Sequence, residues 1–447
     1  MPDPVAENDL QPLADEPSVL GQVDEPGLPE AAVEPTLVET RGFRQVFRAL
    51  RHRNFRLFCF GQIVSLCGTW MQNVAQNWLV YRLTRSEFLM GVTYFCLQLP
   101  VFALAPLGGL ASDRRSRHRI IIITQTLSLV QALVLAYLTL SGRVQVRHVL
   151  VLAAALGCVN AFDMPARQSF LIQMASKEDL LNAISLNSSI FNAARVLGPA
   201  VAGVLVDRLG EGFCFLINGI SFVAVLIGLL AMRVPPFRRS VEESPWDHLI
   251  EGFRFAYHAL HIRYLLLLLG VGTLAGVPAL ILMPFFASDI LHRGSQGLGV
   301  LMASMGVGAL IGTLVLAGRG TTRGLVNVVL FGSTGLGVSL ILLGLSRNFY
   351  LSMAVMFWLG FSTLRQMAST NTLIQSLIPD QYRGRIMAMY TMTVVGLGPF
   401  GSLLAGAIAH RYGPPVTVIA GGAFCLVGSL LFRMRLEEFR RSAQLVK

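Results

Sequence analysis

Two long apolar segments joined by a short basic connection constrain the fold of this chain most. The segments span residues 88–111 and 120–140, and each is long enough to cross about 30 Å of hydrocarbon as one helix. The connection, residues 109–119, carries Asp113 followed by a run of arginines. Short connections rich in Lys and Arg stay in the cytoplasm. The sequence therefore predicts a tight helical hairpin at the cytoplasmic face of a membrane.

The composition extends this interpretation to the whole chain. Of the 447 residues, 53% are hydrophobic and only 14% are charged, whereas soluble proteins carry about 25% charged residues. A net charge of +11 would favour a nucleic-acid partner in a soluble protein, but here the basic residues lie in the connections, where the membrane orientation explains them. The six cysteines lie within apolar segments without a CxxC pair, so we expect buried thiols and no metal site.

Twelve apolar segments predict an all-α bundle of twelve transmembrane helices. We place them at 56–80, 88–111, 119–140, 148–168, 187–208, 212–232, 264–289, 297–318, 324–345, 349–376, 386–409 and 414–434. With the N-terminus in the cytoplasm, roughly 26 Lys and Arg residues fall on the cytoplasmic side and roughly 8 fall outside, as the positive-inside rule requires. Both termini are then cytoplasmic, in a multi-pass protein of a bacterial cytoplasmic membrane.

The connections divide the chain into five regions. They are a tail (1–40), a six-helix half (41–232), a linker (233–263), a second six-helix half (264–434) and a second tail (435–447). The first tail has ten acidic residues, seven prolines and no Lys or Arg, a composition typical of disorder. In the linker, Ser244 and Pro245 precede apolar residues at helical spacing, which predicts an amphipathic helix on the cytoplasmic surface.

Similar segments recur about 200 residues apart, which indicates an internal repeat. Leu171-Ile172-Gln173 precedes Gly198-Pro199, and Leu373-Ile374-Gln375 precedes Gly398-Pro399. The first hairpin reads Gly109, Asp113, Arg114, Arg117 and Arg119, with Ser116 where glycine is usual. This pattern resembles the loop motif of the major facilitator superfamily. Parallel six-helix repeats are also the internal architecture of those transporters.

Four further segments narrow the resemblance. They are Phe162–Gln168, Asn182–Asn187, Arg195–Pro199 and Ile378–Arg385. Together they resemble the branch of the drug:proton antiporters that contains the enterobactin exporter. The resemblance implies gating by residues of the loop motif and of the fourth span, namely Gly109, Asp113, Arg114, Arg117, Asp163 and Arg167. It also implies helix bending at Gly198, Pro199, Gly398 and Pro399.

A stripe of polar residues marks the first span. Its members are Gln62, Ser65, Thr69, Gln72, Asn73 and Gln76. Most are three or four positions apart, so they share one helical face. Polar groups in hydrocarbon are costly unless they face a bundle interior or a wet cavity. We expect this stripe to line a substrate cavity, with interhelical hydrogen bonding as the alternative.

Two arginines lie deep in predicted spans. Arg195 is about 12 Å inside the fifth span, and Arg365 is about 16 Å from the cytoplasmic end of the tenth span, at 1.5 Å per residue. A charge at that depth indicates a functional site, and the alternative is a structural arginine bonded to carbonyl groups. Two such cations would give the cavity a positive field, which favours an anionic or zwitterionic cargo.

Acidic residues are absent from the middle of the predicted spans. Asp163 is the best candidate for proton coupling, yet its place near the cytoplasmic end of its span suits a gate. Asp113 lies at the negative end of its helix dipole and needs a positive partner, unless the cluster is simply solvated. We expect Arg117 to pair with Asp163, and Asp113 to point at the start of the eleventh span near residues 385–387.

The resemblance implies a secondary active transporter that exports small amphipathic molecules of the drug or siderophore type by alternating access. Proton coupling is expected, with the lipid bilayer, the cargo and protons as the partners of a monomeric protein. The alternative is a flippase of the same fold for lysophospholipids or other lipids. A membrane enzyme or scaffold is a third hypothesis, but the loops show no catalytic motif and no cofactor-binding pattern, so we expect no enzyme and no cofactor.

Overall fold

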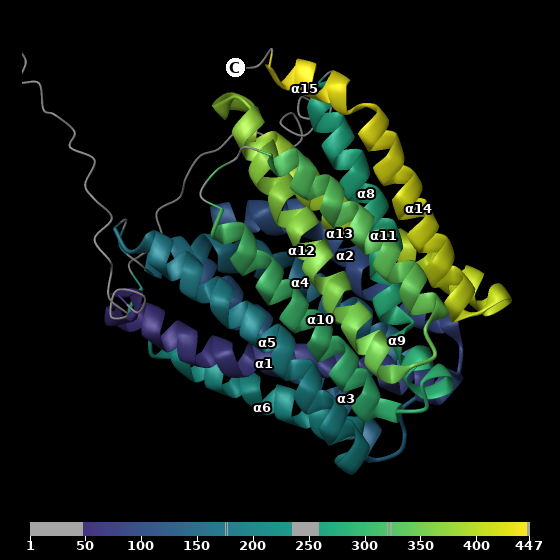
Figure 1. Ribbon diagram of the computed structural model, residues 1–447. Coiled ribbons are helices and arrows are strands. Elements are labelled where there is room, and N and C mark those ends of the chain that lie inside the picture. Colours follow the sequence, from purple (N-terminus) through teal and green to yellow (C-terminus); the bar gives the residue numbers. More distant parts are fainter. Residues whose placement is uncertain are drawn as a thin grey trace, which may run out of the picture. The chain divides into compact units, whose positions relative to one another are not determined.

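The computed structural model describes residues 48–174, 176, 178–234, 259–319, 321 and 324–444. The expected disordered tail and the expected amphipathic helix of the linker lie outside these residues. The N-terminal half begins with a short 3-10 helix, η2. Its helices are η2 (Arg48–Arg51), α1 (Arg53–Thr84), α2 (Glu87–Arg114), α3 (Arg117–Leu140), α4 (Val146–Met174), α5 (Leu180–Leu209) and α6 (Glu211–Leu230) (Figure 1).

The C-terminal half repeats this order, with one interruption after its first helix. Its elements are α8 (Leu260–Ile281), α9 (Met283–Phe285), the π-helix η3 (Phe286–Ile290), α10 (Gly294–Ala317), α11 (Leu325–Leu345), α12 (Phe349–Leu377), α13 (Asp380–Tyr412), α14 (Pro414–Met434) and α15 (Leu436–Gln444). We call the bundle end with the connection from Arg114 to Arg117 the arginine-rich face. The end with the connection from Thr84 to Glu87 is the opposite face.

The described chain is all-α, with twelve helices of twenty residues or more. Ten of them are long and apolar enough to cross a membrane, whereas α1 and α12 are equally long but more polar. The predicted fold of twelve helices is thus confirmed. The span predicted at 264–289 is not one continuous helix, since α8 ends at Ile281. Pro284 follows in α9 and has no backbone N–H to donate to a continuous helix.

Helix α4 also differs from its prediction, since it continues to Met174 instead of ending near residue 168. In the structure the Arg167 guanidinium pairs with Asp163 one turn earlier, so its charge is neutralised within the bundle. The extension carries Asp163 well away from the helix end.

The two halves use the same pairs of packed helices. Helix α2 packs on α4 as α10 packs on α12, and α3 packs on α6 as α11 packs on α14. The closest approaches occur at corresponding glycines. A Cβ atom at Gly108 would lie 2.0 Å from the Ala161 carbonyl oxygen, and one at Gly308 would lie 1.9 Å from the Phe357 carbonyl oxygen. Only glycine permits helix backbones to approach so closely.

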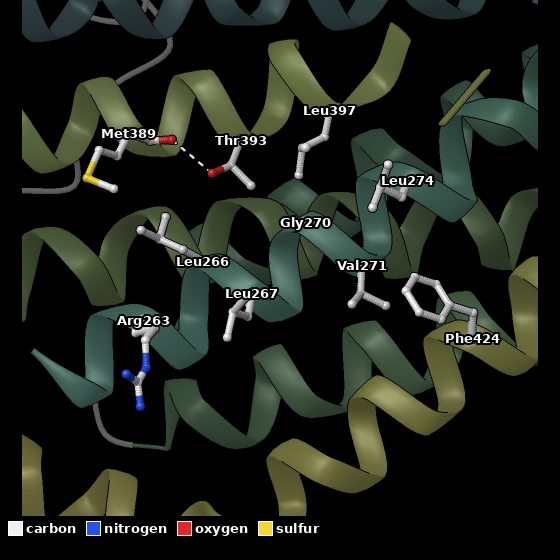
Figure 2. Close-up of a pocket in the computed structure, with 10 residues that line it drawn as sticks. All are labelled: Arg263, Leu266, Leu267, Gly270, Val271, Leu274, Met389, Thr393, Leu397 and Phe424. Atoms are coloured by element: carbon white, nitrogen blue, oxygen red, sulfur yellow. Dashed lines mark hydrogen bonds between the residues drawn. The ribbon is translucent and has the colours of Figure 1, made fainter. Parts of the chain in front are cut away.

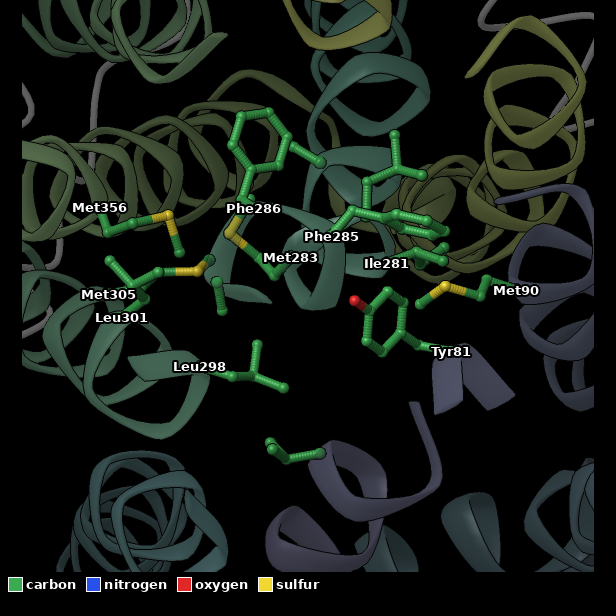
Figure 3. Close-up of a cluster of buried hydrophobic side chains, with 14 of the residues drawn as sticks. Tyr81, Met90, Ile281, Met283, Phe285, Phe286, Leu298, Leu301, Met305 and Met356 are labelled. Carbon is green, nitrogen blue, oxygen red and sulfur yellow. The ribbon is translucent and has the colours of Figure 1, made fainter. Parts of the chain in front are cut away.

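The buried apolar side chains show that the halves meet at one end only. The largest cluster joins them toward the opposite face, where Tyr81 and Met90 pack with Phe285, Phe286 and neighbouring residues (Figure 3). Toward the arginine-rich face each half has a separate cluster, around Phe170 in one and around Ile374 in the other. The hydrophobic seam between the halves therefore closes the opposite face.

Backbone contacts seal the same end. Helix α5 crosses α10 at Gly203 and Gly299, where a Cβ on Gly299 would lie 2.7 Å from the Gly203 Cα atom. Helix α2 crosses α13 where the Ser402 hydroxyl donates a hydrogen bond to the Gly91 carbonyl, with an oxygen–oxygen distance of 3.5 Å. Hydrogen bonds, ion pairs and ring contacts between the halves lie toward this face, among them Tyr81 with Asp289, Glu87 with His410 and Phe95 with Phe400.

At the arginine-rich face, Asp179 attaches η2 to the start of α5. Its buried carboxylate lies 2.8 Å from Arg48 Nε, 2.7 Å from Arg51 Nη2 and 2.8 Å from His52 Nε2. The His52 hydrogen bond and the two arginines lower the pKa of Asp179 below its ordinary value. A lowered pKa in the folded state stabilises the fold at neutral pH, and the contribution is lost only as the pH falls through that lowered pKa.

Replacement of Gly108 by alanine should destabilise the bundle by about 2 kcal/mol or more, because the new methyl group overlaps a backbone oxygen that cannot move aside. The neighbouring variant Gly109→Ala is a matched control, since a Cβ there meets no atom within 4 Å. Thermal unfolding of the two detergent-purified variants, followed by size-exclusion fluorescence, measures the difference. Equal melting temperatures would contradict the close packing of α2 and α4.

Candidate functional site

A buried carboxylate, Asp163 of α4, faces α3 in the N-terminal half. Its residue is 7% exposed, and α3 supplies two hydrogen-bond donors to one oxygen. The Thr124 hydroxyl lies 2.6 Å from Asp163 Oδ1, and the Gln125 amide nitrogen lies 3.1 Å from it. Arg167 binds the other oxygen through Nε at 3.0 Å and Nη2 at 2.8 Å. The carboxylate thus has a positive charge on one side and two polar side chains of α3 on the other.

The network reaches a third helix through Arg167, whose Nη1 donates to the Gln62 side-chain oxygen on α1. Asp163 lies eleven residues before the end of α4, or about 16 Å along the helix at 1.5 Å per residue. The predicted span ended near residue 168 and placed this carboxylate closer to its helix end. Its partner Thr124 lies seven residues after the start of α3 at Arg117, so Asp163 lies about two helical turns from the arginine-rich face. An ionisable side chain buried in a membrane bundle is a candidate functional group.

The loop motif does not share this carboxylate. Arg117 pairs instead with Asp113, with 3.7 Å between Nη2 and Oδ1, and its Nε donates to the Ser112 carbonyl at 3.3 Å. The expected pair of Arg117 with Asp163 was wrong, because Arg167 lies one helical turn from Asp163 and saturates it. Asp113 lies in the last turn of α2, far along the helix from Gly91, where α2 contacts Ser402 of α13. Gly109 and Arg114 complete the motif on the same helix end.

The polar stripe of α1 is mostly buried between helices. Gln62, Ser65, Gln72 and Gln76 are all less than 9% exposed. Gln72 accepts a hydrogen bond from Asn218 of α6 at 2.7 Å and donates to Gln131 of α3 at 3.2 Å. For Gln72, therefore, the structure shows interhelical hydrogen bonding, which was the alternative to lining a substrate cavity. Thr69 bonds the carbonyl of Ser65 within its own helix.

Sequence reasoning did not single out the partners of these amides. Thr124, Gln125, Gln131 and Asn218 are isolated polar residues in otherwise apolar segments. A search for polar residues at matching depth in neighbouring spans could have found them, since buried amides require partners. Their effect is to tie α1, α3, α4 and α6 together by side-chain hydrogen bonds.

A different face of α1 carries side chains that remain available. Asn73 is exposed, and Asn77 one turn later donates to the carbonyl of Ile281 at 3.3 Å, across the seam. Trp70, one turn earlier, lies under the guanidinium of Arg195, which is 5.5 Å from the ring centroid. Gly198 allows this contact, since α5 passes the Trp70 side chain closely there. Asn73, Trp70 and Arg195 thus form a polar and aromatic group beside the seam.

Arg365 lies in the C-terminal half at the position that corresponds to Asp163. The offset that relates Leu171 to Leu373 also relates Asp163 to Arg365. Its guanidinium lies 5.1 Å from the centroid of Phe361, which stacks on Trp358. The Nε atom of Arg365 is buried and has no hydrogen-bond partner among the described residues. The repeat therefore carries a neutralised acid in one half and an unneutralised cation in the other.

The two proline motifs both lie in helices of the seam. Pro199 is buried within α5, and its carbonyl oxygen would lie 2.7 Å from a Cβ atom on Gly299 of α10. In α13, Gly398 precedes Pro399 and lies beside Tyr94 of α2. Each proline removes one backbone hydrogen bond from its helix, at positions where the halves touch.

An apolar pocket of about 490 Å³ lies between α8, α13 and α14 (Figure 2). Leucine and valine side chains line it, with Phe424 near one end and Arg263 near the other. None of the predicted site residues contributes to its wall. It is therefore separate from the polar groups described above.

Comparison with known proteins assigns the chain to a family. Residues 45–446 match the family model described as transmembrane secretion effector. The staphyloferrin A transporter of Staphylococcus aureus is 25% identical, with 86% of this chain and 98% of that protein covered. The multidrug efflux pump Tap of Mycolicibacterium fortuitum is 24% identical, covering 81% and 91%. The enterobactin exporter EntS of Escherichia coli is 22% identical, covering 88% and 94%.

The fold agrees with solved transporters. The crystal structure of the nucleoside transporter NupG matches with a TM-score of 0.68 at 13% sequence identity, covering 86% of this chain and 99% of that one. The predicted resemblance is thus confirmed by sequence and by fold, and the chain is no enzyme. It belongs to the transmembrane secretion effector family of major facilitator transporters.

Proposed function

We propose that this protein exports small amphipathic organic molecules of the siderophore or drug type across a bacterial cytoplasmic membrane. It works as a monomer, by alternating access coupled to protons. The observation that carries the proposal is Asp163, an ionisable group buried deep in the bundle and held by Arg167. The relatives named as a siderophore transporter, an enterobactin exporter and a multidrug efflux pump support the choice of cargo.

The arginine-rich face is the cytoplasmic face in this proposal. The basic connections of the chain gather there, and short basic connections are retained in the cytoplasm. Both termini and the 233–263 linker then lie on the cytoplasmic side, and the two six-helix halves flank the linker. The seam at the opposite face closes the path to the outside, so this conformation takes up cargo from the cytoplasm.

Asp163 is the coupling carboxylate. In the cytoplasm-facing state Thr124 and Gln125 contact one of its oxygens, and Arg167 supplies a positive charge beside the other. Proton binding removes the attraction to the Arg167 guanidinium, which is then left partly buried without its counter-charge. The protonated form therefore favours a different arrangement of α1, α3 and α4, which is how a proton shifts the balance between two conformations.

The cargo carries a negative or zwitterionic group. Arg195 and Arg365 each lie beside an aromatic ring in helices that flank the seam. Asp163 is neutralised by Arg167, so the net field at that depth is positive. Aromatic faces suit the apolar part of an amphipathic molecule and the guanidinium groups suit its anionic part. Asn73 of α1 adds a hydrogen-bonding group.

The loop motif acts in the other conformation. With the cytoplasmic side open, Asp113 pairs only within its own half, with Arg117. When that side closes, Asp113 meets the positive N-terminus of α13, where a carboxylate is stabilised by the helix dipole. Gly109 leaves room for this approach, since no atom lies within 4 Å of a Cβ built there. Arg114 and Arg117 keep the hairpin at the membrane surface.

The topology predicts which residues a membrane-impermeant thiol reagent reaches from outside. In a variant without the six native cysteines, Ser141→Cys between α3 and α4 should react in intact cells. Ser376→Cys near the end of α12 should react only after permeabilisation. Both positions are exposed in the structure. The reverse pattern would invert the assignment of the two faces.

Asp163→Asn should abolish export driven by a pH gradient in proteoliposomes, because an amide cannot carry the proton. It should still allow cargo binding. The variant leaves Arg167 partly buried without its counter-charge, so a loss of stability of about 3 kcal/mol is also expected. Glu211→Gln is the control, since it removes another buried carboxylate that pairs with arginine at 2.7 Å near the opposite face. Gradient-driven export that survives in Asp163→Asn would exclude this residue as the coupling site.

Arg365→Gln should weaken transport of a catecholate-type siderophore by about tenfold or more, the loss expected for one charged hydrogen bond. Export of a cationic dye should be unchanged or improved. Arg365→Lys keeps the charge and should retain part of the activity. Competition assays with both cargo types measure the difference. Selective transport of cations by the parent protein would count against an anionic cargo, and transport of lysophospholipid alone would favour the lipid flippase.

A further inference from the structure

We infer that Tyr81, Arg85 and Asp289 form a latch that holds the opposite face closed, so that Asp289 positions the two halves during transport. The inference rests on the proposed alternating access. Tyr81 and Arg85 belong to the end of α1 in the N-terminal half. Asp289 belongs to the π-helix η3 in the C-terminal half. No sequence pattern singled out these residues, because they lie about 200 positions apart.

The three side chains meet at one carboxylate oxygen. The Tyr81 hydroxyl donates to Asp289 Oδ1 at 2.5 Å, and Arg85 Nη1 lies 2.9 Å from the same oxygen. Arg85 Nη1 also donates to the Tyr81 hydroxyl, and its guanidinium lies 4.5 Å above the Tyr81 ring. Each member therefore contacts the other two. Removal of any one leaves the remaining pair without part of its hydrogen bonding.

The latch continues into the hydrophobic seam. The Tyr81 residue is 1% exposed, and its ring lies 4.8 Å from that of Phe285 in an edge-to-face arrangement. Figure 3 shows Tyr81 facing Phe285 from across the seam. The charged side chains of Arg85 and Asp289 are 62% and 42% exposed. Opening of the seam would hydrate both charges at once, so the latch can break without leaving a charge in hydrocarbon.

The backbone on both sides of the latch is unusual. Arg85 and His292 are the only residues other than glycine with a positive φ in the described chain, at 50° and 51°. Arg85 ends α1, and His292 follows η3. Single π-turns and left-handed non-glycine residues are costly, and they persist where the surrounding contacts impose them. Both residues with positive φ lie next to the ion pair between Arg85 and Asp289 that joins the two halves.

Few other charged contacts join the halves. Among the described residues, the second cross-half ion pair is His410 with Glu87, at 3.6 Å, and it requires a protonated histidine. Asp207 accepts a hydrogen bond from the uncharged side-chain amide of Gln296, at 2.8 Å. The remaining seam contacts are apolar or involve backbone groups. Asp289 with Arg85 is thus the carboxylate–guanidinium pair that joins the halves in the described part of the chain.

The test measures how often the seam opens. Ser295 is buried beside Gly203 at the seam, so Ser295→Cys in a variant without native cysteines reports opening toward the opposite face. A membrane-impermeant maleimide added from that side of proteoliposomes should label it slowly in the parent. Asp289→Asn, Tyr81→Phe and Arg85→Gln should each raise the labelling rate, by about tenfold for loss of a hydrogen bond to a charged group.

Arg82→Gln is the matched control. Arg82 lies one turn before Arg85 and pairs with Glu211 within the N-terminal half, at 2.7 Å, so its loss should leave labelling of Ser295→Cys unchanged. The exchanged pair Arg85→Asp with Asp289→Arg should restore slow labelling, which a merely structural role would not do. Equal labelling in the parent and in Asp289→Asn, with both proteins folded by thermal unfolding, would overturn the latch.

The same experiment separates the latch from the proposed function. Faster labelling in Asp289→Asn without export of any siderophore or dye by the parent would retain the latch and refute the exporter. Export by the parent with labelling unaffected by all three substitutions would retain the exporter and refute the latch.

Discussion

The hydrocarbon of the membrane cannot solvate polar groups, and the arrangement of this protein depends on that constraint. Each polar side chain in the middle of a helix must find a partner in another helix or face water. The buried acid Asp163 finds Arg167, Thr124 and Gln125. The amide of Gln72 finds Gln131 and Asn218. These pairings connect four helices of the N-terminal half and fix how their polar faces are rotated.

The second half follows the same helix pairing but uses small residues more than charges. Gly308 and Gly312 let α10 approach the α12 backbone. The position equivalent to Asp163 is Arg365, which pairs with no carboxylate among the residues that the structure describes. The two halves therefore share a fold and differ in electrostatics. An internal repeat of this kind can place a buried ion pair in one half and a cation without a carboxylate partner in the other.

The seam between the halves explains how one structure can serve transport. A shared apolar cluster and close glycine contacts seal the opposite face, while separate clusters serve each half toward the arginine-rich face. A rocking motion needs such an asymmetry, since contacts that form at one end must be released at the other. Tyr81 and Asp289 lie at the end with the shared cluster, and Asp113 lies at the end where each half has its own cluster.

The sequence by itself determined the membrane class, the twelve helices, the internal repeat and the family, because these depend on segment length, hydropathy and local motifs. It also singled out Asp163, Arg167 and Arg365. Only the tertiary structure decided the partners. Arg117 pairs with Asp113 and not with Asp163, and Gln72 is buried, because a helix sequence does not tell which neighbour its polar face meets. The contact of Tyr81 with Asp289 joins residues remote in the chain, so nothing local could reveal it.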